Sequence, residues 1–125
     1  MLVFQPIQDL ETGAIVGHEA LARFPDLGFG GPDRWFADAF TVDRGVDLEW
    51  LAACSALRYF DTAPRDLLLT VNMSPATVMH LAGKELCPVE LWPRIIIELS
   101  EQVPVEDYPA LERALAPLRS YGARL

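Results

Sequence analysis

The sequence has few basic residues relative to acidic ones. Ten lysines and arginines stand against 18 aspartates and glutamates, which gives the 125 residues a formal net charge of −8 at pH 7. Nucleic-acid polymers are bound largely through lysines and arginines at phosphates, so this balance argues against a DNA or RNA partner. A small phosphate ligand remains compatible with it, because metal ions held by carboxylates can supply the missing positive charge.

Cysteines and long apolar runs are also scarce. Cys54 and Cys87 have no metal-site spacing and form no disulfide framework, which fits a cytoplasmic location, and Cys54 is expected to be a buried free thiol. The longest apolar run is far shorter than the about 20 residues that cross a bilayer, and no signal-peptide pattern follows Met1. The sequence therefore predicts no membrane contact by this chain.

Strand-like apolar runs alternate with helical patterns, and no repeat interrupts them. We expect strands over 2–7, 14–24, 67–72 and 94–99, helices over 33–40, 47–60 and 107–121, and a short helix between Ser74 and Gly83. The first two strands should form an antiparallel hairpin through a turn at Gly13, and residues 123–125 should begin another strand. The segment 25–33 reads as a linker. This order predicts parallel α/β architecture in one piece.

Local signals refine the helices. Asp33 and Asp47 are expected to cap the first two helices, and Ser74 the short one. The helix over 47–60 is expected to bury one stripe, formed by Leu48, Leu51, Ala52, Ser55 and Tyr59. The last helix should bury Leu111, Leu115 and Leu118 and end at Gly122.

Polar residues fall at positions on these strands that suit phosphate chemistry. Alternation along the second strand puts Glu19, Leu21 and Arg23 on one face. Asn72 and Glu98 lie near the carboxyl ends of two further strands, the end that carries the functional groups in α/β barrels. Glu19, Asn72 and Glu98 offer oxygen ligands without histidine or thiolate, a set suited to Mg²⁺ or Mn²⁺.

Each of these residues also has an ordinary structural role open to it. Glu19 and Arg23 could form surface ion pairs, Asn72 could serve a turn, and Glu98 with Glu101 could be a solvated charge pair. Gln5 alone carries no signal. Only the ordered set and its spacing indicate a function.

The ordered set resembles a known family. Gln5-Pro6-Ile7, Glu19-Ala20-Leu21-x-Arg23, Asn72-x-Ser74-Pro75 and Glu98-x-x-Glu101 are similar to the first half of an EAL domain, the bacterial signalling module that hydrolyses cyclic di-GMP. The resemblance covers residues 1–125 and implies a partial EAL-type TIM (β/α) barrel. It implies that this chain is the N-terminal part of a single domain, truncated before the paired-aspartate motif.

The resemblance also implies residue roles. Glu19, Asn72 and Glu98 match metal ligands of the family, while Gln5, Leu21 and Arg23 match positions that contact the dinucleotide. Glu19, Glu98 and Glu101 match catalytic positions, Glu101 by steadying an active-site loop. The family's activity is divalent-metal-dependent hydrolysis of cyclic di-GMP to linear pGpG by an activated water.

Three hypotheses follow. The complete protein is a cyclic di-GMP phosphodiesterase of which this chain, alone inactive, is a part; or the chain binds cyclic di-GMP without turnover as a regulatory module; or it is a structural fragment. A barrel of this kind typically needs about 250 residues. The shorter chain is therefore expected to cover its exposed sheet edge as a homodimer or with further domains of a longer parent.

Overall fold

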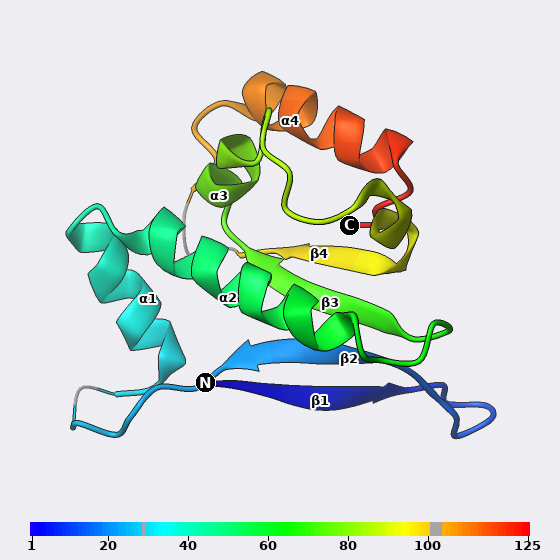
Figure 1. The fold of residues 1–125 in the computed structure, drawn as a ribbon. Coiled ribbons are helices and arrows are strands. Elements are labelled where there is room, and N and C mark those ends of the chain that lie inside the picture. Colours follow the sequence, from blue (N-terminus) through cyan, green and yellow to red (C-terminus); the bar gives the residue numbers. More distant parts are fainter. Residues whose placement is uncertain (29, 101–103) are drawn as a thin grey trace.

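One four-stranded sheet organises the molecule, with its helices gathered on one side (Figure 1). The computed structural model describes residues 1–28, 30–100 and 104–125. The strands are β1 (Leu2–Gln8), β2 (Ile15–Ala22), β3 (Leu68–Met73) and β4 (Ile95–Leu99). The helices are α1 (Pro32–Thr41), α2 (Gly45–Phe60), α3 (Pro75–His80) and α4 (Tyr108–Ser120), with a 3-10 segment η1 (Val89–Arg94) before β4. The spatial order β1-β2-β3-β4 repeats the order in the chain.

The sheet begins with the expected antiparallel hairpin. β1 pairs with β2 so that Gln5 lies opposite Glu19. Asp9 holds the turn, because its carboxylate accepts hydrogen bonds from the backbone N–H groups of Thr12 and Glu11, each at 2.8 Å. These bonds, first the one from Thr12, hold the pKa of Asp9 below its ordinary value.

The remaining strands pair in parallel, which confirms the expected α/β architecture. β3 lies between β2 and β4, with Asn72 directly beside Glu98. After α4, Arg124 forms an isolated parallel bridge with Ile96. Its N–H donates to the Ile95 carbonyl at 3.1 Å and its carbonyl accepts from Ile97 at 2.9 Å, so the expected start of another strand is found here.

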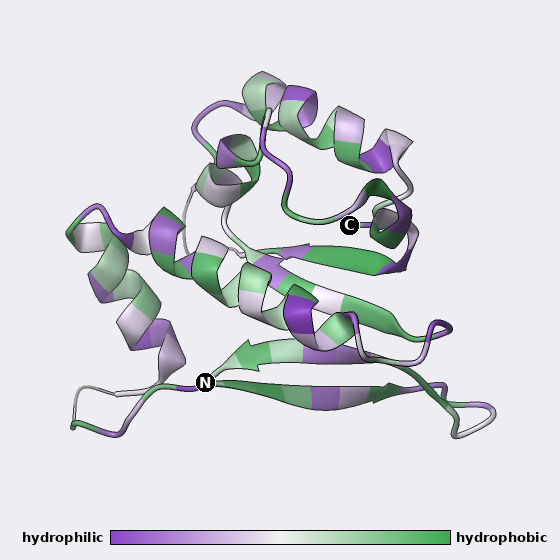
Figure 2. Ribbon diagram, viewed as in Figure 1, coloured by the Kyte–Doolittle hydropathy of each residue, from purple (hydrophilic) through white to green (hydrophobic). Residues whose placement is uncertain are grey.

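The two faces of the sheet differ in chemistry. The covered face carries Leu69, Val71, Ile95 and Ile97, all buried in the core. Helix α2 lies on this face and contacts β1, where the Tyr59 ring stacks on Phe4 with centroids 3.8 Å apart. The other face, here the polar face, carries Gln5, Glu19, Asn72 and Glu98, none of which is buried. Figure 2 shows hydrophilic segments within these mostly hydrophobic strands.

The buried stripe predicted for α2 is wrong by about one position. Leu51 is 62% exposed and Tyr59 is 39% exposed, and Leu48, Ala52 and Ser55 are only half-buried. The residues that α2 buries are Gly45, Glu49, Ala53, Ala56, Leu57 and Phe60. Cys54 is half-buried rather than buried, because it lies beside this stripe.

Two predicted helix caps are also wrong. The first helix begins at Pro32 after Gly31, so Asp33 lies inside its first turn. The second helix begins at Gly45 after Arg44, and Asp47 instead pairs with Arg44 at 3.0 Å. Ser74 does cap α3, accepting a hydrogen bond from the Thr77 N–H at 3.2 Å. On α4, Leu111, Leu115 and Leu118 are buried as expected, and Gly122 follows the helix with a φ of +100°.

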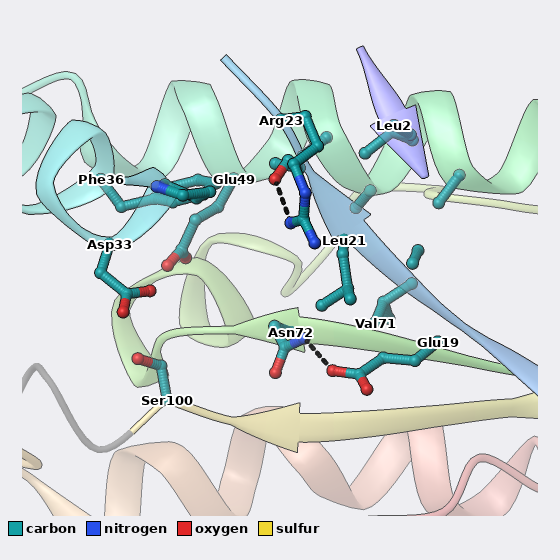
Figure 3. Close-up of a pocket in the computed structure, with 16 residues that line it drawn as sticks. Leu2, Glu19, Leu21, Arg23, Asp33, Phe36, Glu49, Val71, Asn72 and Ser100 are labelled. Carbon is teal, nitrogen blue, oxygen red and sulfur yellow. Dashed lines mark hydrogen bonds between the residues drawn. The ribbon is translucent and has the colours of Figure 1, made fainter. Parts of the chain in front are cut away.

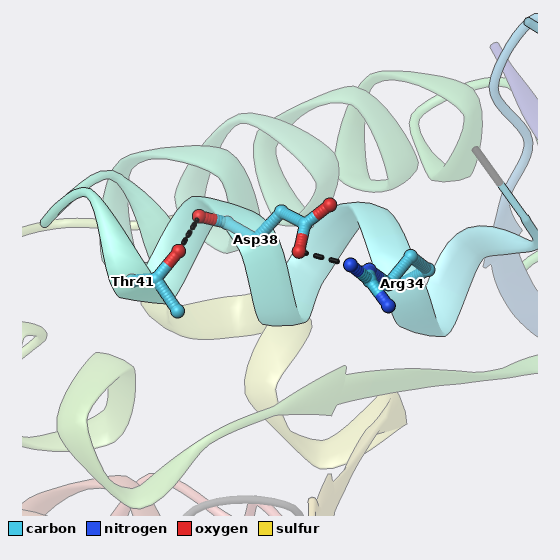
Figure 4. Close-up of polar contacts among 3 residues, drawn as sticks. All are labelled: Arg34, Asp38 and Thr41. Atoms are coloured by element: carbon cyan, nitrogen blue, oxygen red, sulfur yellow. Dashed lines mark hydrogen bonds and ion pairs between the residues drawn. The ribbon is translucent and has the colours of Figure 1, made fainter.

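Helix α1 lies apart from the core and buries none of its residues fully. On its surface the Arg34 guanidinium pairs with Asp38 at 2.9 Å, while the Thr41 hydroxyl donates to the Asp38 carbonyl at 2.6 Å (Figure 4). Its attachment is aromatic, because Trp35 stacks on Phe24 with centroids 5.1 Å apart. None of the helices in the described ranges is long and apolar enough to span a bilayer.

Candidate functional site

A cavity of about 490 Å³ opens between the carboxyl ends of β2 and β3 and the helices α1 and α2 (Figure 3). Three of the predicted site residues on β2 and just after it, namely Glu19, Leu21 and Arg23, line this cavity together with Asn72 of β3. Helix α1 contributes Pro32, Asp33 and Phe36, and α2 contributes Glu49, Ala52, Ala53 and Ala56. The structure therefore brings four of the seven predicted residues to one place.

Glu19 and Asn72 are in direct contact. The Asn72 side-chain nitrogen donates a hydrogen bond to Glu19 Oε1 at 3.2 Å, across neighbouring strands (Figure 3). This bond commits the nitrogen of Asn72 to Glu19, so Asn72 Oδ1 is the atom that the residue can offer to a cation. Two oxygen donors of different charge thus lie side by side at the end of the sheet.

Glu98 and Gln5 extend this pair along the polar face. Glu98 is in register with Asn72 on β4, and neighbouring strands lie about 4.8 Å apart. Gln5 is in register with Glu19 on β1. Both side chains are exposed, and neither lines the cavity. Glu101 lies outside the described residues, although Ser100 before it lines the cavity.

Arg23 supplies positive charge to the cavity. Its Nη1 atom donates to the Ala22 carbonyl at 3.0 Å, and its side chain is exposed. In the described part of the chain no ion pair joins Arg23 to a carboxylate. A guanidinium held in this way keeps N–H groups available for an anion such as a phosphate.

Glu49 is a cavity residue that the sequence pattern did not reveal. It is only 7% exposed, and its Oε2 atom accepts hydrogen bonds from the Ser74 N–H at 2.9 Å and the Ser74 hydroxyl at 2.7 Å. The Thr77 hydroxyl donates to the same atom. The spacing of Glu49 to Ala53, Ala56 and Phe60 is a helical stripe, so a charge within an apolar stripe was the available signal.

The donor set fits a hard divalent cation in kind. Glu19, Asn72 and Glu98 offer only oxygen atoms, which Mg²⁺, Mn²⁺ and Ca²⁺ prefer. Within ranges 1–28, 30–100 and 104–125, no group of three histidine, cysteine, aspartate or glutamate side chains could hold a metal ion. The described residues thus offer two carboxylates and one amide at this end of the sheet.

Comparison with protein families decides where this chain belongs. The model of the EAL domain matches residues 1–125, the whole chain. The chain belongs to the EAL domain family. This membership agrees with the sheet topology, in which a hairpin is followed by parallel strands.

Solved structures of EAL proteins share the fold. The PaMucR phosphodiesterase in complex with c-di-GMP superposes with a TM-score of 0.77 at 22% identity, over 98% of this chain and 55% of that one. Klebsiella pneumoniae BlrP1, in a calcium and cy-diGMP complex, has a TM-score of 0.72 at 20% identity, over 98% and 32%. Bacillus subtilis YkuI, in complex with substrate c-di-GMP and calcium, has a TM-score of 0.65 at 25% identity, over 98% and 33%.

Two relatives of the EAL chain are described as uncharacterized proteins. A protein of Synechocystis is 25% identical over 140 residues, which cover 100% of this chain and 20% of the relative. A protein of Mycobacterium tuberculosis is 27% identical over 137 residues, which cover 99% and 22%. The chain spans about a fifth of the length of these relatives and about half or less of the solved proteins.

Proposed function

We propose that the protein containing this chain binds cyclic di-GMP at the cavity and hydrolyses it to linear pGpG with a divalent metal, Mg²⁺ or Mn²⁺. The observation that carries the proposal is the contact between Glu19 and Asn72 beside Arg23. Oxygen donors for a cation and a guanidinium for a phosphate then lie in one cavity. Relatives solved with c-di-GMP together with calcium or manganese support the choice of ligand and of ion class.

Each residue receives a role in this proposal. Glu19, Asn72 and Glu98 hold the cation, and Arg23 binds a phosphate of the dinucleotide. Leu21 packs against the ligand, and Gln5 orients it from the neighbouring strand. Glu98 and Glu101 belong to the catalytic set together with Glu19. A cation held here would lower the pKa of a bound water, so that it can attack a phosphodiester.

Residues 1–125 are, in this proposal, the N-terminal part of a single EAL domain. The described residues supply two carboxylates and one amide to the cation, and further ligands would come from other parts of the protein. The chain alone is therefore inactive in hydrolysis. A second copy of the chain, as a homodimer, or further domains of a longer parent would cover the sheet edge at β4 and Arg124. A cytoplasmic location stays a prediction.

Calorimetric titration of the chain with cyclic di-GMP in Ca²⁺ tests the proposal, since Ca²⁺ is expected to allow binding without turnover. Binding that disappears in EDTA and in Glu19→Gln is the expected result. Glu112→Gln is the matched control, because Glu112 is exposed on α4 in an ion pair with Arg119. Equal binding with and without EDTA would contradict the proposed cation site.

A binding module without turnover is the second candidate. It predicts that binding of the ligand is retained without hydrolysis. A hydrolysis assay on the full-length protein with Mg²⁺ or Mn²⁺ separates the two. Release of pGpG supports the phosphodiesterase, and metal-dependent binding without pGpG supports the module.

A further inference from the structure

Helices α2 and α3 share a buried polar contact beneath the proposed cation site. Glu49 of α2 reaches the turn between β3 and α3, where Ser74 and Thr77 are fully buried. This turn begins two residues after Asn72. The same glutamate lines the cavity that Glu19 and Asn72 line (Figure 3).

The hydrogen bonds of this contact correspond to those of a capping box, but they come from two helices. In a capping box the helix-capping residue bonds to the N–H three positions on, and a glutamate at that position bonds back to the N–H of the cap. Ser74 makes the first bond to Thr77, but threonine is too short to return the second. Glu49 supplies the missing acceptor for the Ser74 N–H from another helix, at 2.9 Å.

A buried carboxylate is costly unless hydrogen bonds compensate it. Here three donors converge on Glu49 Oε2, two from Ser74 and one from Thr77. An oxygen that already accepts three hydrogen bonds has no lone pair left for a cation. Glu49 is therefore suited to hold the turn, and its Oε2 atom is not suited to ligate a metal.

From this geometry we propose that Glu49 is a positioning residue, which fixes the end of β3 so that Asn72 presents Oδ1 to the cation. The inference rests on the proposed function. β3 is then held from both faces, by Glu49 at Ser74 on the side of α2 and by Glu19 at Asn72 on the polar face. Outer residues that orient a metal ligand commonly contribute about 10- to 100-fold to metal affinity.

The sequence offers a selective probe, because Asn72 is its single asparagine. With ¹⁵N labelling of the asparagine side chain, NMR spectra show the signal pair of one NH₂ group, here called the Asn72 signal. Paramagnetic Mn²⁺ broadens this signal when it binds beside Asn72, so the Mn²⁺ concentration at half-broadening reports local affinity. No dinucleotide and no turnover are needed.

Four proteins complete the test: the unmodified chain, Glu49→Ala, Glu49→Gln and the control Glu112→Gln. Glu49→Ala should raise the Mn²⁺ midpoint by about 10- to 100-fold. Glu49→Gln should raise it less, because the amide keeps an acceptor oxygen of the same size, and Glu112→Gln should not change it. Circular dichroism confirms that each protein is folded at the titration temperature, and Glu49→Gln carries the test if Glu49→Ala does not fold.

The outcomes separate this inference from the proposed function. If the unmodified chain binds Mn²⁺ and the Glu49 variants have the same midpoint, Glu49 has only a stabilising role and the inference is overturned, while the cation site stands. If Mn²⁺ leaves the Asn72 signal of the unmodified chain unchanged, the cation site fails and the inference fails with it. The inference is supported if the Mn²⁺ midpoint is raised in the folded Glu49 variants and unchanged in Glu112→Gln.

Discussion

The covered face and the polar face of the sheet are built by the same strands, but they differ in burial and in the residues they carry. On β4, Ile97 is 1% exposed in the core, whereas Glu98 beside it is exposed on the polar face. On β3, Val71 is buried and Asn72 is exposed in the same way. Stability is therefore concentrated on one side of the strands and the candidate chemistry on the other. Because side chains alternate, single substitutions can address each side separately.

The largest effect on stability is expected at Ile97, and its neighbour provides the control. Ile97→Ala should lower the free energy of unfolding by about 2–5 kcal/mol, because it leaves a cavity in the core. Ile96→Ala removes the same atoms from the opposite face, where the side chain is half-buried, and should lower it less. Denaturant unfolding measures both. Equal losses would show that the polar face is packed as tightly as the covered one.

A smaller loss is expected at Gly17 of β2, which is paired with Leu68 of β3. A Cβ atom at Gly17 would lie 2.6 Å from the Leu68 carbonyl oxygen, closer than such atoms can stand. Gly17→Ala should therefore separate the two strands and lower the free energy of unfolding by about 1–3 kcal/mol. It should also weaken binding of the cation, since Glu19 lies two residues further along β2.

Gly31→Ala is the matched control for Gly17, because nothing lies within 4 Å of a Cβ built there. The two variants are compared by denaturant unfolding and by Mn²⁺ titration. If Gly17→Ala matched Gly31→Ala in both measurements, the close approach of β2 and β3 would have no part in forming the site.

At Asn72 a substitution should affect ligand binding but not stability. Asn72→Ala removes an exposed hydrogen bond to Glu19, so the free energy of unfolding should change by at most about 0.5 kcal/mol. Metal-dependent affinity for cyclic di-GMP should nevertheless fall below detection in calorimetry. Unchanged affinity would remove Asn72 from the ligand set. A large loss of stability would instead show that the polar face contributes to the core.

How far the sequence predicts this site depends on the range of the interactions involved. The residues of the polar face follow from alternation along β2 and from the rule that parallel strands end at one edge, which placed Glu19, Asn72 and Glu98 correctly on the sheet. Their roles remain proposals. Glu49 was missed because a glutamate within a helix is normally solvated, and only its bonds to Ser74 show otherwise.

The contribution of α1 to the lining of the cavity could not be predicted either. Its position depends on the rings of Phe24 and Trp35 meeting across a loop, a contact that no periodic pattern encodes. The error in the α2 stripe has a similar origin. The predicted stripe was chosen for its large apolar side chains, such as Leu51 and Tyr59. The structure instead buries the small Ala53 and Ala56.

The smallest effect concerns Cys87, which is 8% exposed within the core cluster. This effect on stability is absent at neutral pH. Burial, and then the nearby charge of Asp61, raise the pKa of the Cys87 thiol from 9.0 to about 12. Above pH 9 the unfolded chain loses this proton while the folded chain keeps it. The free energy of unfolding should therefore fall between about pH 9 and pH 12.

Cys87→Ala should flatten this fall, and Cys54→Ala, at the half-buried cysteine, serves as the comparison. Lysine and tyrosine side chains titrate in the same range, so the informative quantity is the difference in slope between each variant and the unmodified chain. Denaturant unfolding at pH 8, 9, 10 and 11 measures it. An identical slope for Cys87→Ala would mean that the Cys87 thiol ionises as easily in the folded chain as in the unfolded one. Its place in the core would then be more open to water than the places of Ile97 and Val71.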